Sequence, residues 1–405
     1  MRVAVVAGNQ TPEFGGGYTF VERLLEAIAS FGTDHELIVY DSSVLERVGH
    51  QHEDAWRRAA KCAARAVGAQ RVLRSMAQRL RRDSQADGPA TASPWDRHFR
   101  DAGIDLVWFL RPGEGFCPVS IPHFLTVWDL QPRIQPHFPE ISISGRNWEE
   151  HERHYQRCLP RASRIITGTE VGKQEVTRFY GVAPDNIAVI PLPAPQLAAS
   201  RESGARMRDK YGIDGEFILY PAQFWPHKNH INLLLALERI KREAGLALRL
   251  VLTGSDKGNL GYVRETVSAL GLAAQVDILG FIPMADLSGL YQEALVLAFP
   301  SFFGPDNLPP LEAFALRCPV VAARVAGAEE QLGEAALFFD PADPQDIARA
   351  ILQIHHDRAL RSQLIERGAR LAAERTPRAY VERVCRLLDD FVPIRRCWRH
   401  DYVHS

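Results

Sequence analysis

Short apolar runs that alternate with helical patterns constrain the fold of this chain more than any other feature of its sequence. Runs that are apolar throughout are typical of parallel strands covered by helices on both faces. The first half therefore predicts a doubly wound α/β domain. Its expected strands are Val3–Ala7, Glu36–Tyr40, Leu106–Leu110, His123–Val127, Arg164–Gly168 and Ala188–Pro191, and its expected helices include Tyr18–Ser30 and Val171–Tyr180.

The same alternation restarts after a stretch rich in Ala, Ser and Pro at Pro191–Arg206. We therefore expect a first domain at 1–195, a linker at 196–212 and a second α/β domain at 213–375. Residues 376–405 are expected to form a C-terminal helix and tail that can return to the first domain. The expected elements of the second domain are strands Phe217–Tyr220, Leu248–Thr253, Val276–Leu279, Leu295–Phe299 and Pro319–Ala323, with helices Ile231–Glu243, Tyr262–Leu270 and a helical pattern over Pro344–Asp390.

The composition limits the classes of function. Of the 405 residues, 46% are hydrophobic, and 48 Lys and Arg nearly cancel 49 Asp and Glu. This balance is typical of an ordinary globular protein and gives no support to a nucleic-acid-coating function. The apolar start is too short for a signal peptide, and no run has the roughly 18 apolar residues that a membrane-spanning helix needs. We expect a cytoplasmic protein that at most visits a membrane surface.

One segment differs from the rest in charge. Between Arg57 and Arg82 there are nine basic residues and no acidic one, interleaved with Ala, Val, Leu and Met in a helical pattern. A basic amphipathic helix suits an anionic membrane surface. An ordinary solvated helix face would have the same pattern, so both interpretations stay open.

Two places in the chain are suited to bind anions. Gly15–Gly17 stand between the first strand and the first helix, where free backbone N–H groups and the helix dipole favour phosphate, although a tight structural turn is also possible. In the second domain, Lys228 lies in a loop directly after a strand, where open α/β sheets bind ligands.

A second such loop follows strand Leu295–Phe299. It leads through Asp306 and Asn307 into a helix that starts near Leu308 with two prolines. A pyrophosphate would suit this helix start, and Glu312 could accept hydrogen bonds from sugar hydroxyls, although a carboxylate is also common at the start of a helix. No Cys or His spacing and no Asp-x-Asp pattern indicates a metal site, so we expect no metal and no cofactor.

With these residues in view, the chain resembles the family-4 nucleotide-sugar glycosyltransferases, also described as glycosyl transferases group 1, which have the GT-B fold. The matching pieces occur in the same order over nearly the whole chain. They are Gly15–Gly17, Val127-Trp128-Asp129-Leu130-Gln131, Ile166–Glu170, Lys228-Asn229, Leu252-Thr253-Gly254, Leu279–Pro283, Leu308–Ala315 and Cys318–Val321.

The resemblance implies metal-independent transfer of a hexose from a nucleoside diphosphate sugar, with retention of configuration, in a cleft between two domains. Lys228 would neutralise the departing diphosphate and, with Asp129, form the catalytic pair. The acceptor would be a glycan or a lipid-linked glycan, as in bacterial transferases of surface polysaccharide or lipopolysaccharide. By the same resemblance the donor side is Gly16, Gly17, Lys228, Asp306, Asn307, Leu308 and Glu312, and the acceptor side is Tyr18, Trp128 and Arg133.

The sequence departs from the family pattern at three positions. Gly304 stands where the family usually has a glutamate, eight residues before Glu312, so its contact with the donor sugar would pass to Asp306 or Asn307. Trp128 replaces a histidine, and neither His123 nor His137 is a clear substitute. Ala222 or Gln223 replaces an arginine before the lysine, and Trp225 and His227 could line the donor pocket instead.

The expected function is therefore a hexosyltransferase of cell-surface polysaccharide synthesis, for which mannose from a guanosine donor is one option. A sugar epimerase of the same fold and a catalytically silent scaffold that kept the fold are the alternatives. A nicotinamide-dependent dehydrogenase is disfavoured because its glycine fingerprint is missing.

Overall fold

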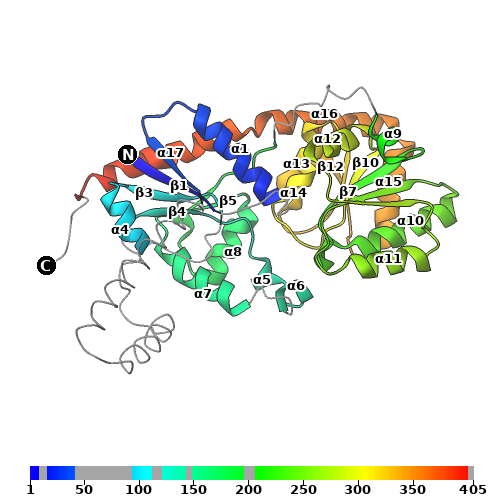
Figure 1. The fold of residues 1–405 in the computed structure, drawn as a ribbon, viewed down its shortest axis with the longest axis horizontal. Helices are drawn as coiled ribbons and strands as arrows, with labels where there is room; N and C mark the ends of the chain where they lie inside the picture. The colour runs from blue at the N-terminus through cyan, green and yellow to red at the C-terminus, as the bar shows by residue number, and fades with distance from the viewer. Residues whose placement is uncertain (9–15, 42–93, 112–120, 143–147, 196–205, 400–405) are drawn as a thin grey trace, which may run out of the picture.

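The computed structural model describes residues 1–8, 16–41, 94–111, 121–142, 148–195 and 206–399. Two six-stranded sheets form two lobes that lie side by side along the molecule (Figure 1). Each pairing within the two sheets is parallel. The expected α/β architecture with two doubly wound domains is confirmed.

The first sheet has the strand order β2-β1-β3-β4-β5-β6. Its central strands are fully buried, because helices cover both faces. The strands are β1 (Arg2–Gly8), β2 (Glu36–Asp41), β3 (Leu106–Phe109), β4 (His123–Thr126), β5 (Arg164–Thr167) and β6 (Ile187–Val189), and the helices are α1 (Gly16–Ser30), α4 (Pro94–Asp101), α5 (Gln131–Ile134), α6 (Pro139–Ser142), α7 (Trp148–Cys158), α8 (Glu170–Tyr180), η2 (Leu159–Arg161) and η3 (Pro184–Asn186).

The second sheet has the order β12-β11-β10-β7-β8-β9. Every predicted strand of both domains is confirmed to within one or two residues, and β12 is an additional strand that the sequence pattern did not indicate. The elements are β7 (Phe217–Pro221), β8 (Arg249–Thr253), β9 (Val276–Gly280), β10 (Val296–Phe299), β11 (Val320–Ala323), β12 (Ala336–Phe339), η4 (Pro226–Lys228), η5 (Gly333–Ala335), α9 (Met207–Tyr211), α10 (His230–Ala244), α11 (Leu260–Ala269), α12 (Met284–Glu293), α13 (Leu308–Ala315), α14 (Ala328–Leu332), α15 (Pro344–His356), α16 (Arg358–Glu374) and α17 (Pro377–Arg395).

Helix ends follow local chemistry. Thr169 caps α8, where its side chain accepts from the Gly172 N–H at 3.1 Å, and Gly181 ends the helix in the left-handed conformation. α13 begins with prolines, which lack the backbone donors that a helix start leaves unpaired.

The C-terminal helices connect the two lobes. α16 packs on α13 of the second domain, and α17 runs along α1 of the first (Figure 1). Between them, the Arg375 carbonyl accepts from the Ala194 N–H at 2.7 Å. The expected linker divides in two: residues 196–205 lie outside the described ranges, and Met207–Tyr211 form α9, which packs on α12.

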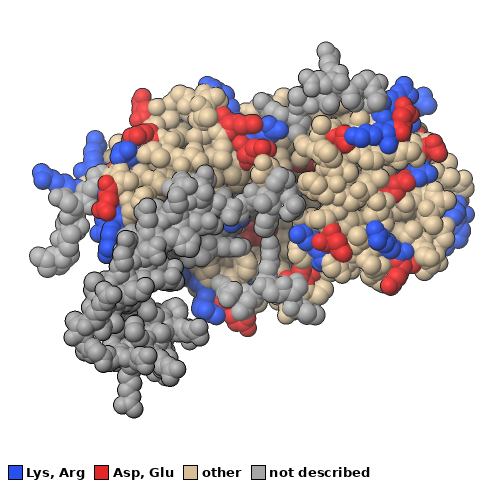
Figure 2. Space-filling model, in the orientation of Figure 1, with Lys and Arg blue, Asp and Glu red and all other residues tan. Residues whose placement is uncertain are grey.

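Charge is mixed on the face of the molecule shown in Figure 2, where acidic and basic side chains lie among each other over both lobes. The basic segment Arg57–Arg82 lies outside the described residues. None of the described helices combines the length and the apolar character needed to cross a bilayer.

Candidate active site

The carboxyl ends of the strands in both sheets meet at the boundary between the domains, and two helices begin there. A carbon added at Gly16, the first residue of α1, would lie 3.2 Å from Cδ1 of Leu308, the first residue of α13. The N-termini of two helices from different domains therefore lie side by side. Their free backbone N–H groups and dipoles make this junction suitable for a phosphate. Gly17, the second residue of α1, is half-buried at the same junction.

Lys228 lies at the end of η4 after β7, and α13 follows β10, the strand that pairs with β7. Its side chain is half-buried, and Nζ lies 5.5 Å from the centre of the Phe299 ring. Burial lowers the pKa of Lys228 to about 8, although the negative charges of Asp129 and Glu140 act to raise it. The loop is held by Asn229, which has a positive φ of 60° and donates from Nδ2 to the carbonyls of Pro300 at 2.9 Å and Pro341 at 2.8 Å.

Asp129 is a carboxylate whose charge acts on three other titratable groups of this region. Its Oδ1 accepts from the Gln131 N–H at 2.9 Å, which turns the chain from β4 into α5. Its negative charge raises the pKa of Lys228, of Glu175 on α8 and of Asp306 in the second domain. Asp129 and Lys228, the predicted catalytic pair, are therefore close enough to interact across the domain boundary.

Asp306 reaches the first domain. Burial, and then the charge of Glu330, raise the pKa of Asp306 to about 8, whereas Arg375 lowers it. Its Oδ1 is buried and has no hydrogen-bond partner in the described part of the chain. The Asp306 carboxyl also lies directly against the backbone of Gly168, at the end of β5.

Asn307 serves the shape of the same loop. Its Nδ2 donates to the Gly304 carbonyl at 2.7 Å, and its backbone N–H and carbonyl both bond to the side chain of Gln331 at 3.0 Å. Gly304 itself has a φ of 130°, which residues with a side chain rarely adopt. The position where the family usually has a glutamate therefore has a backbone shape here that favours glycine.

Glu312 lies one turn into α13 and is only 5% exposed. Its Oε2 accepts from the Tyr291 hydroxyl at 2.8 Å, and burial raises its pKa. The side chain predicted to bind the ribose is thus a nearly buried carboxylate, and the hydrogen bond from Tyr291 on α12 holds it in place.

The three expected acceptor-side residues have different surroundings. Tyr18, on α1, donates to Glu22 at 3.2 Å. Trp128 packs edge-on against Phe20 at 5.6 Å between ring centres, and its buried Nε1 has no partner among the described residues. Arg133 pairs with Glu152 at 3.5 Å and stacks over Trp148 and Phe179, inside the first domain.

Two functional candidates were missed by sequence reasoning. Glu140, on α6, contacts His227 across the domain boundary with Oε1 2.5 Å from Nδ1. Burial, followed by the charge of Asp129, raises the pKa of Glu175 to about 7, and its buried Oε2 has no partner within the described ranges. Neither stands in a motif, and only the tertiary structure brings them to Asp129 and Lys228. His123, in contrast, is a 2% exposed strand residue against Phe109.

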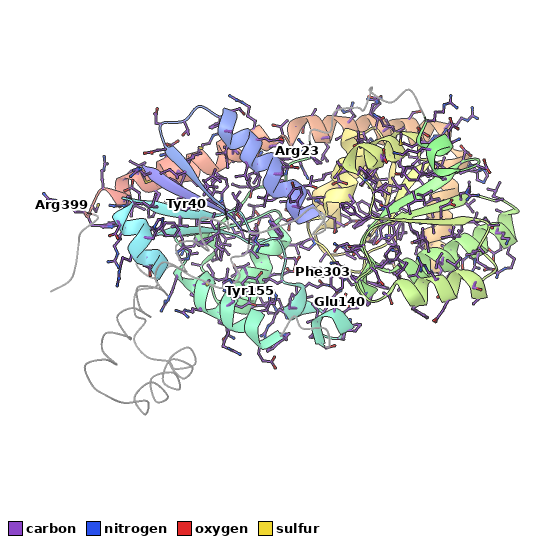
Figure 3. The ribbon with its side chains drawn as sticks, in the orientation of Figure 1. Arg23, Tyr40, Glu140, Tyr155, Phe303 and Arg399 are labelled. Atoms are coloured by element: carbon purple, nitrogen blue, oxygen red, sulfur yellow. The ribbon has the colours of Figure 1, made fainter. Side chains whose placement is uncertain are left out.

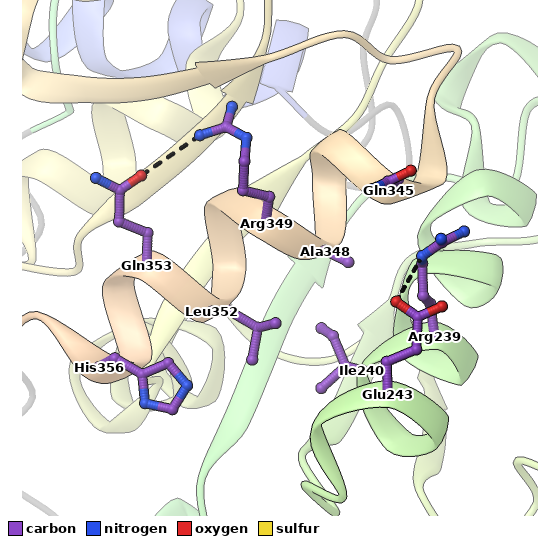
Figure 4. A pocket seen from close by; sticks show the side chains of 9 residues that line it. All are labelled: Arg239, Ile240, Glu243, Gln345, Ala348, Arg349, Leu352, Gln353 and His356. Carbon is purple, nitrogen blue, oxygen red and sulfur yellow. Dashed lines mark hydrogen bonds and ion pairs between the residues drawn. The ribbon is translucent and has the colours of Figure 1, made fainter.

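A shallow groove of about 460 Å³ lies elsewhere, between α10 and α15 on the second domain (Figure 4). Its polar side chains are partly paired with one another, as Arg239 is with Glu243 and Arg349 with Gln353. None of the predicted site residues lines it.

Comparison with known proteins agrees with the two-domain fold. Residues 205–371 match the family described as Glycosyl transferases group 1. In its backbone, the chain is similar to Anabaena HepE, solved in complex with UDP and glucose, with a TM-score of 0.65 and 15% identity over 96% of this chain and 100% of that one. It is similar to WaaG, a glycosyltransferase involved in lipopolysaccharide biosynthesis, with a TM-score of 0.63 and 14% identity over 96% and 99% of the two chains.

The chain covers only part of the length of the curated relatives that it matches. The chain is 28% identical to O-antigen chain mannosyltransferase B of Escherichia coli over 54% of this chain and 58% of that protein. It is 26% identical to the serotype-specific mannosyltransferase WbdA of Escherichia coli over 78% and 41% of the two lengths. It is 34% identical to D-inositol 3-phosphate glycosyltransferase of Acidothermus cellulolyticus over 51% and 48%. The chain thus spans about 40% to 60% of the length of these relatives.

The two-domain architecture, with a parallel six-stranded sheet in each domain, is that of the GT-B fold class, as predicted. Within that class, residues 205–371 in the second domain match the family of glycosyl transferases group 1, in agreement with the resemblance drawn from the sequence.

Proposed function

We propose that this protein transfers a hexose from a nucleoside diphosphate sugar to a glycan or lipid-linked glycan in the synthesis of a cell-surface polysaccharide, with retention of configuration. The observation that carries the proposal is the junction of α1 and α13, where two helix N-termini lie together, with Lys228 in the loop after β7, the strand that pairs with β10 before α13. A diphosphate is the ligand whose charge and size suit two helix starts and one ammonium group. The mannosyltransferase names of two relatives make mannose the first sugar to test.

In the proposed reaction, the bond between the anomeric carbon and the diphosphate oxygen breaks, and a bond to the acceptor oxygen forms on the same face. The acceptor proton leaves with the nucleoside diphosphate. Negative charge develops on the leaving oxygen, so the Lys228 ammonium and the amides at Gly16 and Leu308 would stabilise the transition state most. Asp129, next to Lys228, would hold the acceptor hydroxyl, and Glu312 would hold the ribose of the donor.

The test is a panel of guanosine, uridine, adenosine and thymidine diphosphate sugars, with binding by calorimetry and slow hydrolysis by nucleotide release. Lys228→Ala should lower turnover by about 100-fold or more, with a smaller effect on donor affinity. Glu312→Ala should chiefly weaken donor binding, by about 10-fold. Lys241, exposed on α10, gives the matched control because its Nζ bonds only to the Gly271 carbonyl.

Other outcomes would identify the alternatives. A donor whose sugar is inverted while free nucleotide is released without an acceptor would favour the epimerase. A wild type that binds none of the donors would favour the silent scaffold. Metal independence predicts unchanged turnover in a chelator, and a loss of turnover there would refute it.

We also propose that the segment Arg57–Arg82 attaches the enzyme to an anionic membrane at the inner face, where a lipid-linked acceptor would lie. The support is its sequence alone, with nine basic residues and no acidic one. Co-sedimentation with vesicles of phosphatidylglycerol, but not of phosphatidylcholine, should be lost when the arginines are replaced by glutamine. Equal sedimentation of the two proteins would contradict the proposal.

A further inference from the structure

A short stretch of the first domain reaches across to the loops of the second. After β4, α5 and α6 extend toward the second lobe (Figure 1). Gln135 donates from Nε2 to the Phe302 carbonyl at 3.0 Å. The Phe138 ring lies 6.3 Å from Phe302 and 6.0 Å from His227, measured between ring centres. These contacts bring α6 to the loop that contains Lys228.

Glu140 makes the strongest contact of this stretch. It lies at the boundary between the lobes (Figure 3) and is only 5% exposed. Its Oε1 accepts from the His227 backbone N–H at 3.2 Å and lies 2.5 Å from His227 Nδ1. The His227 carbonyl in turn accepts from the Phe302 N–H at 2.9 Å. His227 is therefore held through its ring, its N–H and its carbonyl.

The pKa values of His227 and Glu140 both lie below neutral pH. Burial, and then the charge of Lys228, lower the pKa of His227 to about 4, although Glu140 and Asp129 act to raise it. Burial acts to raise the pKa of Glu140, but the hydrogen bonds that it accepts from the ring and the backbone of His227 bring it below the usual range. A neutral imidazole therefore donates its Nδ1 proton to an ionised carboxylate.

Lys228 follows His227 directly within the single turn of η4. The Lys228 N–H donates to the Trp225 carbonyl at 3.1 Å, and the Tyr220 hydroxyl donates to the Lys228 carbonyl at 2.6 Å. Because Lys228 is the next residue in this hydrogen-bonded turn, a displacement of His227 moves the backbone from which the lysine side chain extends.

From this geometry we infer that Glu140 is a positioning residue that acts through His227 and holds Lys228 at the cleft when the two domains are together. The inference rests on the proposed function, in which Lys228 stabilises the leaving diphosphate. It adds a residue from the acceptor-side domain to the placement of a donor-side cation.

The experiment compares Glu140→Ala and Glu140→Gln with Glu152→Ala. Glu152 is a matched control, since it is an 8% exposed carboxylate whose partners Arg133, Gln156 and Tyr180 all lie in the first domain. Thermal unfolding shows that each variant is folded. Amide hydrogen exchange at His227 reports the contact itself, and donor turnover and donor affinity report the placement of Lys228.

In Glu140→Ala, exchange at His227 should rise and the turnover number should fall by about 10-fold or more, with donor affinity changed by less than about 3-fold. Glu140→Gln keeps an oxygen acceptor and should recover both the protection and most of the turnover. Glu152→Ala should change neither readout.

Three results would overturn the inference: unchanged exchange in Glu140→Ala, unchanged turnover in that variant, or a Glu140→Gln variant as slow as Glu140→Ala. The last would mean that the charge of Glu140 acts directly, without positioning. A wild type that binds and hydrolyses no nucleoside diphosphate sugar would instead refute the proposed function. The two failures are thus separate.

Discussion

Replacement of Gly168 by alanine should disturb the contact between the domains without unfolding either. Gly168 follows β5, and its φ is not among the positive values, so its own backbone accepts a side chain. An added Cβ would lie 2.5 Å from Oδ1 of Asp306, whereas ordinary contact begins at 3.4 Å. Oδ2 and Cγ of Asp306 would lie closer still, so the Asp306 side chain must shift by more than the 0.9 Å that Oδ1 alone requires.

That displacement acts where the proposed catalytic groups of the two domains meet. A misplacement of about 1 Å can cost on the order of 100-fold in rate, so donor turnover of Gly168→Ala should fall by about 10-fold to 100-fold. Overpacking of this size should also lower the free energy of unfolding by about 1 to 3 kcal/mol. Donor hydrolysis and thermal unfolding measure the two effects.

Two comparisons make the result specific. Gly32→Ala is the control, because an added Cβ there meets nothing within 4 Å. Asp306→Ala removes the obstructing carboxyl, so Gly168→Ala should cost less in that background than in the wild type. Wild-type turnover in Gly168→Ala, or the same loss in both backgrounds, would refute the steric argument.

Three further predictions concern charge. The pKa of Lys228 is lowered to about 8 and its charged form is the useful one, so kcat/KM for donor hydrolysis should fall as pH rises through about 8, and a flat profile from pH 7 to 9 would contradict this. The folded pKa of Glu175 is raised to about 7 from the ordinary 4.5, so its ionisation destabilises the fold above that pH. Glu175→Gln should therefore raise the free energy of unfolding at pH 8 by up to about 3 kcal/mol, which is measured as a higher melting temperature. Below pH 4.5 the variant should melt like the wild type, because Glu175 is protonated in both the folded and the unfolded state. The Glu330 carboxylate accepts from two N–H groups at the start of α8, at 2.6 and 3.3 Å, so Glu330→Ala should lower stability by about 1 kcal/mol, whereas Glu334→Ala, 85% exposed in its side chain, should not.

The strands could be predicted because each is a short run that is apolar throughout and bounded by turn residues. β12 (Ala336–Phe339) was missed since it has only four residues, two of them half-buried, directly after a helical turn. α7 (Trp148–Cys158) was missed for a different reason: it is a charged helix with few apolar residues to form a recognisable stripe. A local sequence pattern predicts a helix or strand only where its buried residues form a recognisable apolar run or stripe.

The site divides in the same way. Gly16, Leu308 and Lys228 stand at the ends of strands or the starts of helices, so their chain positions alone indicated an anion site. Glu140 and Glu175 could not be predicted, since each gains its environment from a residue distant in sequence. Asn307 shows the reverse: it stands in a motif, yet its amide is used to shape its own loop.

Two of the inter-domain contacts share one kind of chemistry, in which a carboxylate of each domain accepts from backbone N–H groups of the other. Glu140 of the first domain accepts from His227 of the second, and Glu330 of the second accepts from Glu170 and Val171 of the first. Such contacts are directional and break without exposing much apolar surface. Because backbone groups supply the donors, the contacts depend on the relative placement of the two lobes and little on neighbouring side chains. A carboxylate in this role therefore reports the contact between the domains, and of the two only Glu140 contacts the residue next to Lys228, the proposed catalytic lysine.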